Sequence, residues 1–209
     1  MPCNHKFKDQ LNLTHLDYEP TTLIVGSFNP EWPASNTAEW FYGRTASNCF
    51  WDILPRLYGE ASLIDATHVE WKQFCKEKQI AITDLISAID DAEETNPEHA
   101  KMLGGFSDRA IEHNFEDFSY VNIVEILKQH PTIKNVYITR GVTDAFWRHI
   151  WNPVAHYCST HKLHERKLLK PAGEDTSYQH QAYNKLHSEN AIARLEDYLL
   201  MRWQQEWHF

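Results

Sequence analysis

The stretch Leu23-Ile24-Val25-Gly26-Ser27-Phe28-Asn29-Pro30 decides the fold. Its first three residues are apolar and two of them are β-branched, which predicts a short buried strand. The Gly-Ser-Phe-Asn-Pro that follows requires a sharp turn as the chain leaves the sheet. Open α/β sheets place their ligands at the carboxyl ends of their strands, so we expect a binding loop here.

A second loop follows at Trp40-Phe41-Tyr42-Gly43-Arg44, where an aromatic cluster and one arginine lead into a predicted helix over 48–57. Ser47 is suited to be the N-cap of this helix, and its large apolar residues are spaced to face a core. We therefore expect two loops rich in glycine, asparagine and aromatic residues to face each other across one crevice.

Composition limits the class of protein. The chain has 209 residues, of which 42% are hydrophobic, and this is typical of a globular domain with a substantial core. No stretch is long and apolar enough to cross a membrane, and the first ten residues lack the apolar run of a secretion signal. We expect a cytoplasmic monomer with no membrane partner. The formal charge of -9 argues against nonspecific coating of nucleic acid, although one local basic cleft remains compatible with it.

The cysteines and the clustered histidines do not have the spacing of a metal site. No CxxC or comparable pair occurs, and three neighbouring histidines fit neither one helical face nor a zinc pattern. We therefore predict no metal and expect the thiols to be buried or free. The residues concerned are Cys3, Cys49, Cys75, Cys158, His156, His161 and His164.

The remaining pattern alternates strands and helices. We expect the first twenty residues to wrap the surface, an acidic connection over 90–105, and a solvated basic face over 162–170. No repeat or linker interrupts the chain, so the order predicts one three-layer α/β/α domain over 1–209 with a mostly parallel sheet. The predicted strands are 79–85, 135–139 and 168–169, and the further predicted helices are 69–76, 121–127, 144–156 and 182–203.

Several segments resemble the uracil-DNA glycosylase superfamily, especially its mismatch-specific and hypoxanthine-type branches. Gly26-Ser27-Phe28-Asn29-Pro30 resembles the first motif of that family. Phe41-Tyr42-Gly43-Arg44 and Asn48-Cys49-Phe50-Trp51-Asp52-Ile53-Leu54 resemble its Tyr-Tyr-Ala-His-Pro-Arg-Asn-x-Phe-Trp block. Ile80-Ala81-Ile82-Thr83-Asp84-Leu85 stands where the family has Gly-Ile-Ala-Leu-Trp-Asp, and the segment 130–136 precedes its fourth strand. The motifs occur in the family's order over nearly the whole chain.

The resemblance implies a four-stranded parallel sheet with flanking helices and no metal or organic cofactor. The sequence also departs from the family in two places. The segment 169–175, Leu-Lys-Pro-Ala-Gly-Glu-Asp, lacks the serine or histidine usual in the second motif, and Arg44-Thr45-Ala46-Ser47 replaces His-Pro-Arg.

Candidate site residues follow from the chemistry of base removal. A base that leaves the stack needs a pocket that grips its face and its hydrogen-bonding edge. Phe28 and Tyr42 could stack on it, although core packing accounts for them equally well. Likeness to the mismatch-specific branch makes Asn29 the first candidate for holding a water near the anomeric carbon, and likeness to the hypoxanthine-type block makes Asn48 the second. The alternative for Asn48 is a helix-start residue that satisfies backbone groups.

The loops offer further contacts to DNA. Backbone amides at Gly26 and Ser27 can donate to a base carbonyl or a phosphate, because glycine allows close approach. We expect the cations Arg44, Arg140 and Lys170 to meet phosphates, unless they are ordinary surface charges. By the family's pattern, the wedge into the duplex would be Pro171-Ala172-Gly173, which has no bulky apolar tip.

Three functions remain open at this stage. The first is a monofunctional DNA glycosylase that excises uracil or hypoxanthine from DNA carrying a damaged or mismatched base. The second is a non-catalytic nucleotide or nucleic-acid binding module on the same fold, favoured by the acidic balance and the altered second motif. The third is a hydrolase of free nucleosides. The sequence has no GxxxxGK, GxGxxG or HExxH motif, which argues against kinase, dehydrogenase and zinc-protease functions.

Overall fold

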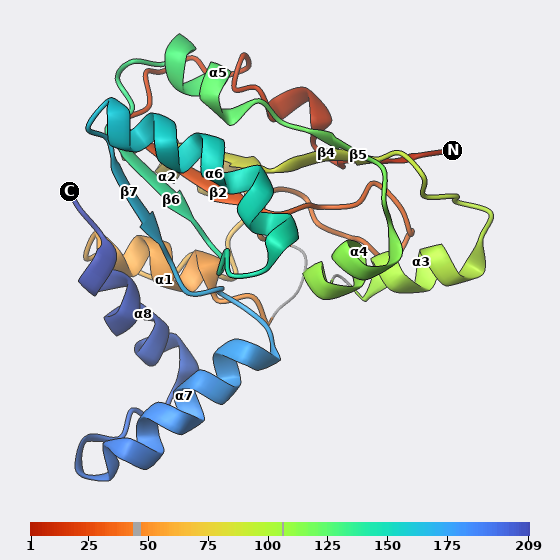
Figure 1. Cartoon of the computed structure of the whole chain (residues 1–209). Helices are drawn as coiled ribbons and strands as arrows, with labels where there is room; N and C mark the ends of the chain where they lie inside the picture. The colour runs from red at the N-terminus through yellow and green to blue at the C-terminus, as the bar shows by residue number, and fades with distance from the viewer. Residues whose placement is uncertain (44–46, 106) are drawn as a thin grey trace.

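The structure is a computed structural model that describes residues 1–43, 47–105 and 107–209 (Figure 1). Two sheets and eight α-helices occur in these ranges. In chain order the elements are β1 (Cys3–Asn4), β2 (Thr22–Gly26), α1 (Phe50–Leu57), α2 (His68–Glu77), β3 (Ile80–Asp84), β4 (Ile86–Ile89), α3 (Pro97–Gly104), α4 (Asp108–Asn114), β5 (Phe118–Tyr120), α5 (Ile123–Gln129), β6 (Asn135–Ile138), α6 (Ala145–Thr160), β7 (His164–Lys167), α7 (Glu174–Leu186) and α8 (Leu195–Glu206).

A four-stranded parallel sheet with the order β3-β2-β6-β7 forms the centre of the fold. The strand predicted around Leu23 lies in its interior, with Ile24 opposite Ile82 on one side and opposite Tyr137 on the other. All five residues of β2 are buried, as expected of a strand that is covered on both faces. The prediction of a central, mostly parallel four-stranded sheet is confirmed.

Successive side chains of β2 point to opposite faces of the sheet and so enter two different cores. Leu23 and Val25 pack with the apolar residues of α5 and α6, whereas Ile24 packs with the aromatic residues of α1, α2 and α8. Helices therefore cover both faces, and the predicted three-layer α/β/α arrangement is confirmed (Figure 1).

A second, antiparallel sheet with the order β1-β4-β5 was not predicted. Its strands have only two to four residues each, too few to show a clear alternation of apolar and polar side chains. The first residues of the chain do not simply wrap the surface, because Cys3 pairs with Ile89 and Asn4 with Ala88. This pairing brings the N-terminal segment next to the end of β3.

The acidic segment expected to be a connection contains the whole of α3, and α4 follows closely. Both helices have side-chain caps, since Asn96 accepts a hydrogen bond from the Glu98 N–H and Ser107 accepts one from the Ala110 N–H. Pro97 stands at the first position of α3, where its missing N–H costs nothing. The Asn-Pro and Ser-Asp pairs signalled helix starts that the acidic composition obscured.

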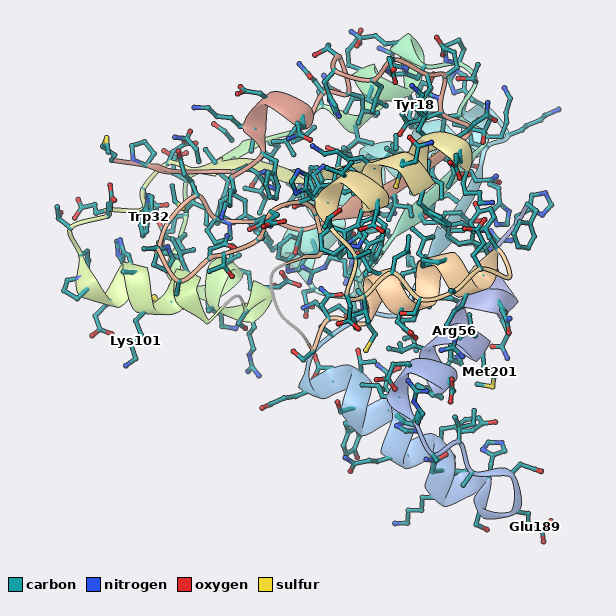
Figure 2. All side chains as sticks on the ribbon, turned by 180° about the vertical axis from the view of Figure 1, so that it is seen from behind. Tyr18, Trp32, Arg56, Lys101, Glu189 and Met201 are labelled. Atoms are coloured by element: carbon teal, nitrogen blue, oxygen red, sulfur yellow. The ribbon has the colours of Figure 1, made fainter. Side chains whose placement is uncertain are left out.

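Two boundaries near the C-terminus also differ from expectation. The last strand is His164–Lys167, not Leu168-Leu169, and its charged residues suit the edge of a sheet. The predicted single helix 182–203 is two helices, α7 and α8, joined by a turn. Asn184 stabilises this turn with both groups of its amide, which bond the Ile192 N–H and the Ile192 carbonyl at 2.8 Å each. Glu189 lies at the tip of the resulting hairpin, which projects from the sheet (Figure 2).

Candidate active site

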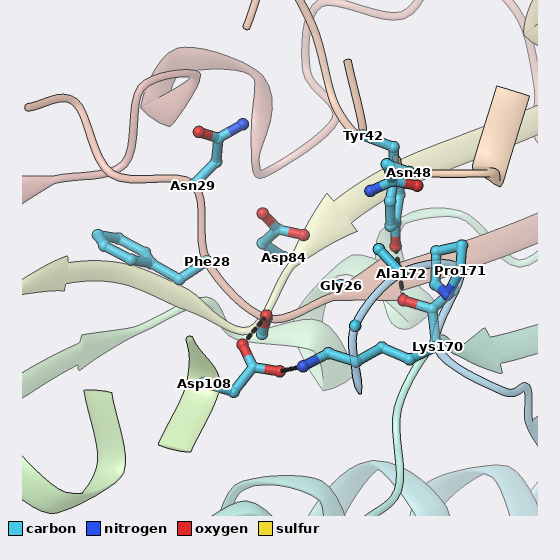
Figure 3. Close-up of a pocket in the computed structure, with 13 residues that line it drawn as sticks. Gly26, Phe28, Asn29, Tyr42, Asn48, Asp84, Asp108, Lys170, Pro171 and Ala172 are labelled. Atoms are coloured by element: carbon cyan, nitrogen blue, oxygen red, sulfur yellow. Dashed lines mark hydrogen bonds and ion pairs between the residues drawn. The ribbon is translucent and has the colours of Figure 1, made fainter. Parts of the chain in front are cut away.

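A pocket of about 140 Å³ opens at the carboxyl ends of the parallel strands (Figure 3). The loops after β2, β6 and β7, the last residue of β3, the start of α4 and the segment before α1 contribute to it. The carboxyl ends of the strands are where an α/β sheet is expected to bind a ligand. The pocket is lined by Gly26, Ser27, Phe28, Asn29, Tyr42, Asn48, Asp84, Asp108, Thr139, Lys170, Pro171, Ala172 and Gly173. The two loops expected to face each other do so.

Gly26 is the last residue of β2, and its lack of a side chain makes the pocket possible. A Cβ at this position would lie 2.1 Å from Oδ1 of Asp84 and 2.9 Å from the hydroxyl oxygen of Tyr42. Both distances are far below van der Waals contact. Any other residue at this position would push Asp84 and Tyr42 apart.

Asn29 lies in the loop after β2 and is only 5% exposed. Its Oδ1 accepts a hydrogen bond from Nδ2 of Asn36, and its carbonyl accepts one from the Lys6 N–H at 2.8 Å. These bonds fix the backbone and the amide plane. Nδ2 of Asn29 donates to no group in the described part of the chain, so a donor remains for a bound water or base.

Asn48 lines the same pocket from the segment before α1. Its Oδ1 accepts a hydrogen bond from the Phe50 N–H at 3.0 Å, which is the helix-start role that the sequence left open. The neighbouring Cys49 N–H donates to the carbonyl of Pro171 at 2.8 Å, so this segment is tied to the loop after β7. Asn48 therefore has a structural bond through its oxygen, while its Nδ2 makes no bond within the described residues.

The two aromatic candidates, Tyr42 and Phe28, line the pocket and also pack against other rings. Tyr42 stacks face to face on Phe50 with ring centroids 3.7 Å apart, and its hydroxyl bonds the Thr139 hydroxyl at 2.8 Å. Burial, helped by the carboxylate of Asp84, raises the pKa of Tyr42 well above its ordinary value, so the hydroxyl stays protonated. Phe28 is 5% exposed and meets the ring of His5 edge-on at 5.7 Å. Both rings thus belong partly to the core.

Asp84 ends β3 beside Gly26 and places a carboxylate in the pocket. Its Oδ2 lies 2.7 Å from Nε2 of His5, a residue buried under the pocket. Its Oδ1 accepts no hydrogen bond from any residue that the structure describes. A carboxylate oxygen can only accept, so Asp84 offers an open acceptor to whatever enters the pocket.

A second carboxylate, Asp108, lies at the start of α4 and is held differently. The Ser27 hydroxyl donates to its Oδ1 at 2.6 Å, while Nζ of Lys170 and Nη1 of Arg140 lie 2.5 and 3.0 Å from its Oδ2. Burial opposes the charged form, but Lys170, Arg140 and the Ser27 hydroxyl together hold the pKa of Asp108 below its usual value. This cluster joins the loops after β2, β6 and β7 to α4.

The three predicted phosphate contacts have different surroundings. Arg140 is 8% exposed, pairs with Asp108, and places its guanidinium 3.4 Å from the centre of the Trp147 ring. Lys170 also pairs with Asp108, but 40% of its side chain remains exposed at the pocket. Arg44 lies outside the described residues. Of the two cations that the structure describes, Lys170 lines the pocket and has the more exposed side chain.

The predicted wedge loop forms one wall of the pocket. Pro171 is buried, Ala172 is half-buried, and Gly173 is exposed with a φ of 110°. This left-handed φ favours glycine, and α7 begins at the next residue. Thr176 holds the loop from within α7 by donating to the carbonyl of Lys170 at 3.0 Å.

The sequence did not single out Asp84, Asp108, Thr139 or His5. Asp84 was visible as the polar end of an apolar strand, directly comparable to the Gly-Ser at the end of β2. Asp108 and His5 had no such signal, because one starts a helix in a segment that looked irregular and the other precedes the first recognisable strand.

The part of the chain that the structure describes has neither a metal-binding cluster nor a membrane-spanning helix. Within the described ranges no three histidine, cysteine, aspartate or glutamate side chains converge as a metal site would require. The four cysteines are buried free thiols, and burial raises the pKa of Cys49, the one beside the pocket, to about 11. In the same ranges no helix is both long enough and apolar enough to span a bilayer.

Comparison with known proteins agrees with this architecture. No protein-family model matches the sequence, and no curated protein does. A similar solved structure is the solution NMR structure of a protein from Methanosarcina acetivorans described as a "putative uracil DNA glycosylase". The two chains are 16% identical, the alignment covers 92% of this chain and 94% of the other, and the TM-score is 0.53. The likeness is one of fold: this chain shares its three-layer α/β/α architecture with that protein.

Proposed function

We propose that the protein is a monofunctional DNA glycosylase that hydrolyses the N-glycosidic bond of a deaminated base, uracil or hypoxanthine, in DNA. One observation carries the proposal. Two asparagine amides and an open carboxylate, from Asn29, Asn48 and Asp84, line one small pocket at the ligand-binding edge of a glycosylase-like fold.

The polar groups of the pocket suit a deaminated base. Uracil and hypoxanthine each present a ring N–H beside a carbonyl, so they need acceptors and donors in one place. The Nδ2 groups of Asn29 and Asn48 are donors, as are the backbone amides near Gly26. The narrow pocket requires the base to be flipped out of the helix, and unstacking costs least for a mismatched base.

The same groups can support hydrolysis. In our proposal Asn29 positions a water and Asp84 accepts its proton as the oxygen attacks the anomeric carbon. The bond from that carbon to the base nitrogen breaks, and its electron pair leaves with the base. The sugar is positively charged in the transition state, so the nearby carboxylate of Asp84 also stabilises it electrostatically.

Lys170 and the loop 171–173 are proposed to meet the DNA backbone beside the flipped nucleotide. Their place at the pocket wall supports this role, together with the exposure of the Lys170 side chain. Arg44 stays a predicted phosphate contact. Arg140 is proposed to act only indirectly, because its charge is already matched by Asp108.

The test is a base-release assay on end-labelled single and double strands that contain uracil, hypoxanthine, xanthine or an oxidised pyrimidine. We expect free base and an alkali-labile site for one of the first two, and a large loss of rate in Asn29→Ala and Asn48→Ala. Asp197→Asn is the matched control, because Asp197 is an ion-paired aspartate on α8 that does not line the pocket.

The two other functions give different results in the same assay. A binding module would retain oligonucleotides in a salt-sensitive manner and release no base at high protein excess. A nucleoside hydrolase would cleave free nucleosides in preference to DNA. Either result would refute the proposal.

A further inference from the structure

His5 reaches the pocket because the N-terminal segment is part of the smaller sheet. After β1 pairs with β4, the His5 N–H donates to the carbonyl of Ser87 at 2.8 Å, and His5 forms an isolated bridge with Pro30. The His5 ring is therefore anchored between the loop that carries Asn29 and the strands that follow Asp84. It is 1% exposed, so water does not compete for its nitrogens.

The hydrogen bonds of His5 determine which nitrogen carries the proton. The Phe7 backbone N–H donates to Nδ1 of His5 at 3.0 Å, so Nδ1 must present its lone pair. The proton of the ring is then on Nε2, which lies 2.7 Å from Oδ2 of Asp84. His5 is thus a neutral donor to the carboxylate and not a cation.

Three aromatic rings keep the imidazole in this orientation. The centroids of Phe7, Phe28 and Phe41 lie 5.9, 5.7 and 5.6 Å from that of His5. A buried imidazole among phenyl rings is unfavourable unless both nitrogens are hydrogen-bonded, and here both are. These contacts hold the imidazole ring in place, and the hydrogen bond from the ring then holds Oδ2 of Asp84.

The other oxygen of Asp84 is limited by the end of β2. Gly26 leaves room for Oδ1 and nothing more, since a Cβ there would lie 2.1 Å from this oxygen. With Oδ2 bonded to His5, the carboxylate cannot rotate without losing a buried hydrogen bond. Oδ1 is therefore kept as the oxygen available to the pocket.

We propose that His5 is a positioning residue, which acts on the reaction by holding Asp84 with Oδ1 available to the water. The inference rests on the proposed function, and it goes beyond it by including the N-terminal strand in the site. The alternative is that His5 is a core histidine that contributes only to stability. The two differ in whether the effect of His5 depends on Asp84.

A double-mutant cycle separates them. We expect His5→Phe, which keeps a ring but loses both hydrogen bonds, to slow single-turnover base release about 100-fold, the scale of a misplaced catalytic group. In the Asp84→Asn background the same change should alter the rate by about twofold or less, because the group it positions is already lost. Equal losses in both backgrounds would overturn the proposal.

Conservative replacement gives a second readout. His5→Gln places an amide donor near the position of Nε2, so we expect it to restore the rate to within about tenfold of the wild type. The matched control is His180→Phe on α7. The His180 imidazole is hydrogen-bonded to the carbonyl of Ile192 at a distance of 2.6 Å, and His180 does not line the pocket. This variant should lower the melting temperature without slowing base release. If His5→Gln is as slow as His5→Phe while both stay folded, the positioning role is wrong.

An NMR measurement on the wild type tests the inference independently of activity. Long-range ¹H–¹⁵N correlations should show His5 protonated at Nε2 and unprotonated at Nδ1, with a hydrogen bond to Asp84. A cationic ring or a proton on Nδ1 would refute the geometry. If the tautomer is as expected but no substrate loses a base, the proposed glycosylase function fails and the arrangement of His5 and Asp84 stands.

Discussion

The pocket has two buried aspartates, and their partners differ. Asp84 accepts a hydrogen bond from a neutral histidine and keeps one oxygen open, whereas Asp108 is surrounded by a lysine, an arginine and a serine hydroxyl. A carboxylate whose charge is neutralised by cations is well suited to joining elements and poorly suited to chemistry. A carboxylate held by a neutral donor keeps its charge for the ligand. The comparison therefore predicts which aspartate is catalytic and which is structural.

The largest expected effect is on base release. Replacing Asp84 by Asn keeps the shape but removes the base and the negative charge, so we expect the single-turnover rate to fall about 10²- to 10⁴-fold, the usual contribution of general base catalysis. Asp108→Asn should slow release far less. Rates measured at enzyme excess on the best substrate decide this. The contrast between the aspartates fails if Asp108→Asn is the slower variant.

Stability should show the opposite order. Asp108→Ala leaves buried Arg140 without its partner, which typically costs about 3–5 kcal/mol of unfolding free energy. Asp84→Ala removes the carboxylate that accepts the hydrogen bond from His5. We expect the unfolding free energy to fall by about 1–3 kcal/mol, because the buried His5 donor is left unsatisfied. Urea unfolding of both variants and of the control Asp197→Ala measures the difference. Equal losses for Asp84→Ala and Asp108→Ala would show that the two sites are held alike.

Low pH should destabilise the folded protein by protonating Asp108. Because its pKa is lower in the folded protein than in the unfolded chain, Asp108 contributes stability that is fully present above its ordinary range. This contribution is lost below about pH 4, as the pH falls through the folded pKa. Melting temperatures between neutral pH and strong acid should therefore fall more steeply in the wild type than in Asp108→Asn. Parallel curves would contradict the assignment.

The smallest effect concerns Lys170, whose charge serves both Asp108 and the proposed DNA phosphate. Lys170→Gln should weaken binding several-fold at low salt and reduce the salt slope by roughly one released counterion. Lys185→Gln, an exposed lysine on α7, is the control and should change neither. Fluorescence anisotropy at several salt concentrations measures both slopes. An unchanged slope in Lys170→Gln would place the phosphate contact elsewhere.

Much of the fold could be predicted from the sequence, because buried parallel strands are continuous apolar runs. Residues 23–25, 79–85 and 135–139 became β2, β3 and β6 for this reason. The antiparallel sheet could not be predicted, since its strands are short. The charged edge strand His164–Lys167 looked like a solvated face, and it is partly one.

The pocket could be predicted in part. The loop after β2 and the segment before α1 stood out through their glycine and asparagine residues, and the structure brings Asn29 and Asn48 to one cavity. The contact of His5 with Asp84 joins residues 79 positions apart, and no local pattern encodes such a pairing. Arg140 looked like a surface cation because a sequence does not reveal that Asp108 and Trp147 enclose it.

The positions of these residues along the chain have a consequence for synthesis. His5, Gly26, Asn29, Tyr42 and Asp84 all lie in the first 84 of 209 residues, whereas the Asp108 cluster is incomplete until Lys170 has been made. Translation proceeds from the N-terminus, so the ribosome synthesises the residues proposed to be reactive long before it completes the Asp108 cluster.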